Sequence, residues 1–164
     1  MEPNLVENWL RRDPVRWISG GLAGLLAAVV AIGFAMILAS TAGLETWFPL
    51  KLIGSIVLGP VATDINLAQG AVAGGILFVL TCIFLGSVFA HFVYTNALKG
   101  LLAMGLVWGL FSWIFIWNLY MQSFNTILAA QVSSAAAFPI CVLFGLTLAS
   151  VSGFDRMIRH QKLE

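Results

Sequence analysis

The sequence predicts an all-α integral membrane protein in which four spanning helices form a bundle, with residues 1–164 as a single membrane domain. Two observations carry this prediction. Hydrophobic residues make up 60% of the chain and charged residues 9%, whereas soluble domains contain about 25% charged residues. In addition, four uncharged apolar segments are each long enough to cross a hydrocarbon core of about 30 Å as a helix.

The N-terminal region is expected to form a short surface helix followed by the first span. Apolar and polar side chains fall on opposite faces of residues 4–12, a pattern typical of helices that lie in the membrane interface. Asp13-Pro14 follows, and these residue types favour the N-cap and the first helical position. The first span covers about 17–42. Its apolar run exceeds that of a signal peptide, so we expect an uncleaved span.

A shorter apolar helix is expected between the first and second spans. Pro49 at its start and Gly59-Pro60 at its end bound a helix over about 49–58. Such a helix covers about 15 Å, half of the hydrocarbon core, so it is interfacial or re-entrant. Lys51 and Ser55 lie one turn apart and form its polar edge. Two interpretations stay open: a half-buried helix packed on neighbouring spans, or a loop that lines a pore or a substrate path.

The remaining spans are expected at about 68–95, 100–122 and 135–154, the last with Pro139 in its first turn or at a kink. Four spans place both termini on one side of the membrane. All lysines and arginines except Lys51 fall on that side, and the positive-inside rule then places both termini in the cytoplasm. We therefore expect a multi-pass protein of the bacterial inner (cytoplasmic) membrane.

Small residues form a stripe along nearly every span. No hydrophobic force drives helices together in lipid, so close backbone approach through small residues does this work. The positions predicted to pack helices are Gly20, Gly24, Gly75, Gly86, Gly105, Gly109, Gly145 and Ala149. Membrane lipids, and either other integral membrane subunits or further copies of the chain, are expected to cover the remaining surface.

A candidate polar site within the membrane lies near the end of the second span. Ser87, His91 and Tyr94 fall at i, i+4 and i+7 and so share one helix face. An ionisable residue within a span is a functional-site hypothesis by default. His91 could be a neutral interfacial residue hydrogen-bonded to Ser87 or to a lipid headgroup. It could instead relay protons, donate to a quinone, or ligate a metal or haem.

Tryptophans of the third span form a candidate surface for a partner, lipid, pigment or quinone. Trp113 and Trp117 share one helix face, and Trp117 fits an interfacial aromatic belt. Trp108 and Trp113 lie deeper in the span than a belt requires. Because an indole N–H needs an acceptor, we expect protein or one of these ligands against them.

The sequence contains no catalytic set and no metal site that we recognise. Its acidic residues all lie outside the spans, and no HExxH motif or nucleophile elbow occurs. Cys82 and Cys141 are isolated, and a bis-histidine haem would need a second intramembrane histidine besides His91. Basic clusters for nucleic-acid binding are missing. We therefore expect no catalysis, no cofactor beyond an interfacial lipid, quinone or pigment, and no nucleic-acid partner.

Together these patterns favour a non-catalytic accessory or structural subunit of a larger bacterial inner-membrane complex, energy-transducing in character, either respiratory or photosynthetic. The alternative is a small homo-oligomeric channel or transporter for an ion or small solute. Coupled transporters usually carry charges within their spans and matching broken helices in two halves. This sequence shows neither feature, which is why the alternative takes second place.

Overall fold

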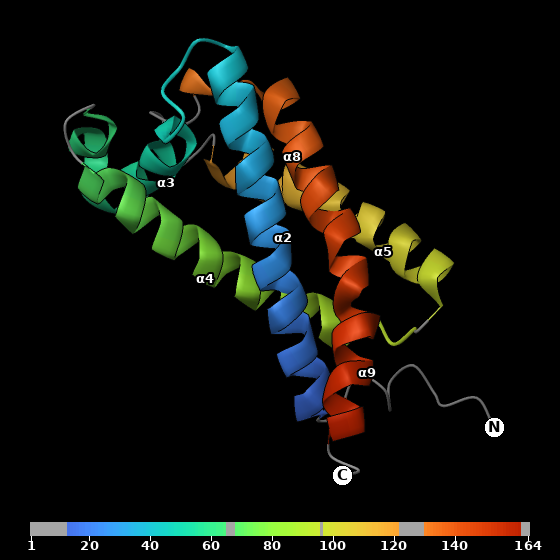
Figure 1. Ribbon diagram of the computed structural model, residues 1–164. Coiled ribbons are helices and arrows are strands. Elements are labelled where there is room, and N and C mark those ends of the chain that lie inside the picture. The colour runs from blue at the N-terminus through green and yellow to red at the C-terminus, as the bar shows by residue number, and fades with distance from the viewer. Residues whose placement is uncertain (1–12, 65–67, 96, 122–129, 162–164) are drawn as a thin grey trace.

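The computed structural model describes residues 13–64, 68–95, 97–121 and 130–161 (Figure 1). Within these ranges every regular element is helical. Four helical segments are long and apolar enough to cross a membrane, namely Pro14–Thr41, Ala68–Phe92, Leu98–Leu119 and Ser134–His160. The prediction of an all-α, four-span, multi-pass membrane protein is confirmed. The surface helix predicted at 4–12 lies outside the described residues.

Helix α2 (Pro14–Thr41) begins as its sequence predicts. Asp13 is the N-cap, its carboxylate accepts a hydrogen bond from the backbone N–H of Arg16 at 3.2 Å, and Pro14 occupies the first helical position. At the other end, Gly43 takes a positive φ of 74°, a conformation that favours glycine. The first span is thus set by local capping signals at its start and by a glycine turn just beyond its end.

The short helix after the first span is α3 (Phe48–Leu58), and a 3₁₀ turn, η1 (Gly59–Thr63), continues it. Gly59 ends α3 with a φ of 67°, and Pro60 follows inside the turn. Figure 1 shows α3 beside the first turns of α4 (Ala68–Phe92). The predicted helix at 49–58 is therefore present and is packed against a spanning helix.

The last two spans differ in detail from the prediction. The third contains α5 (Leu98–Phe111) and then a π-helical stretch, η2 (Ser112–Met121). The fourth contains α8 (Ser134–Thr147), the 3₁₀ turn η3 (Leu148–Ser150) and α9 (Val151–Gln161). The helix that contains the span predicted at about 135–154 continues to Gln161. Asp155, which reads as the start of a polar tail, is buried in the fold.

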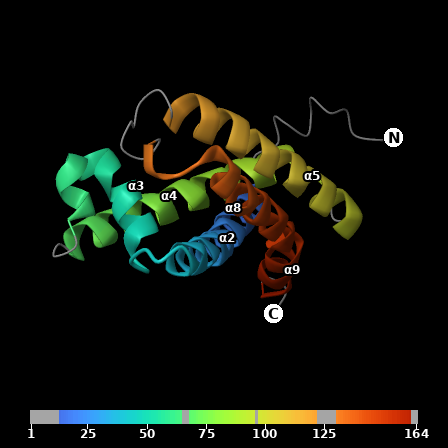
Figure 2. The same cartoon turned by 90° about the horizontal axis from the view of Figure 1, so that it is seen from above.

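Helix α2 packs against α4 on one side and against α8 and α9 on another (Figures 1 and 2). Helix α5 packs mainly on α8. The start of α2 and the end of α9 lie at the same end of the molecule, whereas α3 lies at the other end (Figure 1). The core is formed where α2, α4, α5 and α8 meet, around side chains such as Phe89, Leu101 and Leu148, and it includes Ala149.

Glycine seams bring helix backbones into direct contact, and two of them join predicted spans. Between α2 and α4, a methyl group on Gly20 would lie 2.9 Å from Cα of Ser87, and one on Gly86 would lie 2.7 Å from Cα of Gly24. Between α5 and α8, Gly145 would bring a methyl group to 2.8 Å from Cα of Gly109. A third partner, Gly105, faces the carbonyl of Gly145. The predicted glycines of these two pairs therefore lie at helix crossings.

The contact predicted at Gly75 is displaced by one residue. A methyl group there would meet only the side-chain methyls of Leu50, at 3.9 and 4.0 Å, which is ordinary van der Waals contact. At Gly74 a methyl group would instead approach the backbone of Leu50 and Gly54, and at Gly70 that of Ala62. The reason is that α3 packs on the α4 face that carries Gly70 and Gly74, and the next residue points about 100° away.

Candidate functional site

The predicted polar face of α4 is covered by a residue of α2. Ser87 donates a hydrogen bond from Oγ to the backbone carbonyl of Trp17 at 3.2 Å, and the Trp17 indole N–H donates to Nδ1 of His91 at 3.2 Å. The two rings meet edge to face with centroids 5.4 Å apart. Because the Gly20–Gly86 seam holds α2 close to α4, Trp17 is brought directly over Ser87 and His91.

This arrangement fixes which imidazole nitrogen carries the proton. Since Nδ1 of His91 accepts a hydrogen bond from Trp17, the neutral ring carries its hydrogen on Nε2. The side chain is half-buried. The hydrogen bond that the structure gives the His91 ring comes from Trp17 and not from Ser87.

Tyr94 does not share the helix with Ser87 and His91, because α4 ends at Phe92 and residues 93–95 are not helical. The predicted set at i, i+4 and i+7 is corrected to two members plus Trp17. The helix ends here for a tertiary reason. Arg16 Nη2 donates to the carbonyls of Val93 at 2.7 Å and Thr95 at 3.2 Å, so a cation satisfies the carbonyls that a longer helix would bond internally.

Behind this face lies a charged cluster that the sequence reasoning missed. Arg16 is 3% exposed and pairs through Nη1 with Asp155 Oδ2 at 3.6 Å. Arg159 bridges Asp155 at 3.1 Å and Asp13 at 2.6 Å. The cluster ties together the start of α2, the residues after α4, and α9. The i, i+4 spacing of Asp155 and Arg159 was the available signal, but it reads as a solvated tail until the fold is known.

The pKa of Asp13 reflects its place in this cluster. Partial burial raises the pKa of the carboxyl, but hydrogen bonds from the Arg159 side chain and from the Arg16 backbone N–H oppose this effect. Together with the positive charge of Arg159, these hydrogen bonds outweigh the effect of burial and hold the pKa of Asp13 below its ordinary value of 3.8. Asp13 is therefore the ionised N-cap of α2 and an anchor for α9.

The tryptophan surface divides into two environments. Trp113 donates from Nε1 to the backbone carbonyl of Ser134 at 3.0 Å. Asn118 in turn donates to the carbonyl of Trp113 at 3.0 Å and accepts a hydrogen bond from Ser134 Oγ at 2.7 Å. This network joins the π-helical stretch to the start of α8, so the acceptor expected for the Trp113 indole comes from the protein itself.

Trp108 packs inward rather than on an outer surface. Its ring contacts Phe89 at a centroid distance of 5.9 Å and stacks on Phe111 at 5.7 Å. Its indole N–H, like that of Trp117, is buried without an acceptor among the described residues.

The polar edge of α3 points into the protein. Lys51 is 2% exposed, and its Nζ donates to Oε2 of Glu45 at 2.8 Å and to the backbone carbonyl of Asp64 at 3.2 Å. Ser55 is also buried and donates to the carbonyl of Leu52 at 2.6 Å. Of the two interpretations of this helix, the geometry is that of a helix packed on neighbouring elements, with a buried lysine paired to a partly exposed glutamate at its first turn.

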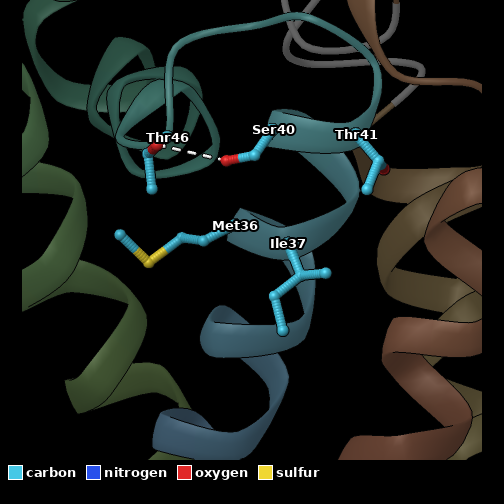
Figure 3. A pocket seen from close by; sticks show the side chains of 5 residues that line it. All are labelled: Met36, Ile37, Ser40, Thr41 and Thr46. Carbon is cyan, nitrogen blue, oxygen red and sulfur yellow. Dashed lines mark hydrogen bonds between the residues drawn. The ribbon is translucent and has the colours of Figure 1, made fainter.

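Two hollows open at the α3 end of the molecule. One, of about 320 Å³, is lined by neutral side chains from the end of α2 and the following loop, and Figure 3 shows Ser40 facing Thr46 across it, with their hydroxyls 3.1 Å apart. The other, of about 450 Å³, lies between the start of α3 and the first turns of α4. It is lined by Glu45 and Lys51 as well as apolar side chains, so it alone of the two carries charge.

No group of three or more histidine, cysteine or acidic side chains that could hold a metal ion occurs in the described part of the chain. Cys82 and Cys141 are free thiols. Both lie at the glycine seams, where the Cys82 carbonyl faces Gly24 and the Cys141 carbonyl faces Gly109. Comparison with protein-family models, curated proteins and solved structures gives no match.

Proposed function

We propose that this protein is a non-catalytic, structural subunit of a larger complex in a bacterial inner membrane. One observation carries the proposal: the strongest polar groups near the spans serve the chain's own packing. Arg16 binds two carbonyls at the end of α4 and pairs with Asp155, and Lys51 pairs with Glu45. A catalytic or transporting site would instead aim such groups at a ligand or a water-filled path.

The helix crossings support the same proposal. The glycine seams bring α2 against α4 and α5 against α8 at backbone distance, which leaves no room for a solute between the members of each pair. The two buried cations also lie at opposite ends of the molecule, Arg16 where α2 begins and Lys51 in α3. They do not line a common route across the bundle.

The outward surface is apolar, as expected for lipid and for neighbouring membrane helices. On α4, large exposed side chains recur at four-residue spacing, at Val72, Ile76, Leu80 and Phe84. Arg156 and Arg159 lie with Arg16 at the end where α2 begins and α9 ends. By the positive-inside rule this end faces the cytoplasm, and the α3 end faces the opposite side of the membrane.

Purification in a mild detergent tests the proposal directly. Native mass spectrometry of the tagged chain is expected to find it in a fixed ratio with other integral membrane polypeptides. A monomer or a uniform homo-oligomer, with no other subunit present, would contradict the proposal.

Reconstitution into vesicles supplies a second arm. We expect ion and solute fluxes equal to those of empty vesicles. A flux that Lys51→Ala removes, while Lys99→Ala leaves it unchanged, would establish a channel or transporter instead. Lys99 is the matched control because its side chain is exposed, whereas Lys51 is buried.

A further inference from the structure

The hollow of about 450 Å³ between α3 and α4 has one charged side and one apolar side. Its volume falls within the range of about 300–1,000 Å³ typical of small-molecule sites. Glu45, Trp47 and Lys51 form the charged and aromatic side. The remaining lining residues are Leu50, Ala68, Ala71, Val72 and Gly75.

Space exists here because α4 presents small side chains to the hollow. Ala68, Ala71 and Gly75 fall at i, i+3 and i+7 and so share a helix face. At Gly75 an added methyl group would meet only the Leu50 methyls, at 3.9 and 4.0 Å, so the backbone here is open rather than packed. From Ala68 to Gly75 this face extends about 10 Å along the helix.

The charged side is an ion pair of which Glu45 is the accessible partner. The Glu45 side chain is 34% exposed, and its Oε2 accepts a hydrogen bond from the buried ammonium of Lys51 at 2.8 Å. Its carboxylate therefore remains partly accessible, and Glu45 lines the hollow. Trp47 lies beside it and is 54% exposed. A carboxylate next to an accessible indole recognises an ammonium group through charge and cation–π attraction.

We propose that this hollow binds a phospholipid whose headgroup carries an ammonium, such as phosphatidylethanolamine. The ammonium lies on the Glu45 carboxylate and the Trp47 ring. An anionic headgroup lacks the cation that these two side chains recognise. The first acyl methylenes lie along Leu50, Ala71 and Val72.

The position of the hollow in the fold suits this occupant. It lies at the α3 end of the molecule, beside the first turns of a spanning helix (Figure 1). An exposed tryptophan at a span end is typical of the headgroup level of a membrane. The charged side is thus at the depth of headgroups while the apolar side continues toward the acyl chains. A structural subunit and a channel could both bind a lipid in this hollow, so this inference does not depend on the proposed function.

Lipid retention measured by native mass spectrometry tests this inference. The purified protein is mixed with equal amounts of dioleoyl-phosphatidylethanolamine and dioleoyl-phosphatidylglycerol. We expect phosphatidylethanolamine to be retained about tenfold better, the ratio that one charge-assisted hydrogen bond supplies. Equal retention of the two lipids would overturn the inference.

Substitutions separate the two sides of the hollow. Gly75→Leu fills the apolar side and leaves the ion pair intact, so lipid retention is expected to fall to background. Gly33→Leu is the matched control, because an added Cβ there meets no atom within 4 Å and the residue does not line the hollow. It should retain lipid as the unmodified chain does.

Glu45→Gln tests the charged side, and the preference between the two lipids is expected to approach one. Ala71→Leu is a second filling variant for the case that Gly75→Leu does not fold, and a folded state is verified for each by its helical circular dichroism. If a folded Gly75→Leu or Ala71→Leu protein retained phosphatidylethanolamine fully, or if Glu45→Gln kept the preference, the hollow would not be the binding site.

Discussion

Replacing Gly86 by alanine should destabilise the fold through the α2–α4 seam. The new methyl group would lie 2.7 Å from Cα and 2.8 Å from the backbone nitrogen of Gly24, and it would also press on the carbonyl of Gly20. These are backbone atoms, so no side-chain rotation can relieve the contact. Carbon atoms normally approach to about 3.5–4.0 Å, so α2 and α4 must separate by about 1 Å at this crossing.

The expected magnitude follows from two opposing effects. Overpacking a well-packed site typically costs about 1–3 kcal/mol, and the upper part of that range applies because rigid backbone opposes the methyl group. Alanine also favours helix over glycine by about 1 kcal/mol. The net loss in the free energy of unfolding should therefore be about 2 kcal/mol.

Gly75→Ala on the same helix supplies the control, because its methyl group meets only the Leu50 methyls at 3.9 and 4.0 Å. That variant should be neutral or more stable by up to about 1 kcal/mol. Unfolding by titration with sodium dodecyl sulfate in mixed micelles, followed by circular dichroism, measures both variants. Equal stabilities for Gly86→Ala and Gly75→Ala would refute the close approach at this seam.

Three further predictions concern the end of the molecule where α2 begins. Arg16→Met removes one of the two cations at Asp155 and the donor to the Val93 and Thr95 carbonyls, while Arg159 stays paired with Asp155. It should cost about 1–3 kcal/mol. Arg16→Met combined with Asp155→Leu should cost less than the sum of the two single losses, and additive losses in the same titration would contradict the ion pair. The pKa of Asp13 is lowered in the folded state, so its contribution to the free energy of unfolding is complete above pH 3.8 and is lost as the pH falls through the folded-state pKa. The difference in this free energy between the unmodified chain and Asp13→Asn should therefore shrink only at acidic pH. Finally, ¹⁵N spectra should show the uncharged His91 ring as its Nε2–H tautomer, and Trp17→Phe should shift its Nδ1 resonance because the indole donor is lost. An unchanged resonance would mean that the hydrogen bond does not form.

Several features follow from residues that are near one another in the sequence. Four long uncharged apolar segments identify the spans, and Asp13-Pro14 marks the start of α2. Pro49 and Gly59 similarly bound the short helix α3. These signals depend on a few neighbouring residues and on the mean hydropathy of a segment of the chain. They can therefore be recognised without knowledge of the contacts between helices.

The helix ends that differ from the predicted span ends depend on distant residues. Helix α4 ends at Phe92 rather than at residue 95, and the carbonyls beyond it bind Arg16 of another helix. Helix α9 continues to Gln161 with Asp155 buried against the same arginine. Local hydropathy places both charges in solvent, and only the packing of α9 on α2 gives them partners.

The candidate site shows the same division. Sequence spacing alone placed Ser87 and His91 on one face of the second span, but their partner is Trp17, which lies on a different helix. The spacing of Lys51 and Ser55 likewise predicted a polar edge on α3, yet it did not reveal that the edge is buried and paired with Glu45.

By itself, the sequence determined that this is a four-span helical membrane protein, where most of its helices begin, and which glycines of α2, α5 and α8 lie at helix crossings. The tertiary structure decided which face of α4 carries α3, which charges are buried, and where a hollow is left between them. The physical reason is that hydrophobic length and capping act over one or two helical turns. Ion pairs, seams and hollows exist only once separate helices meet.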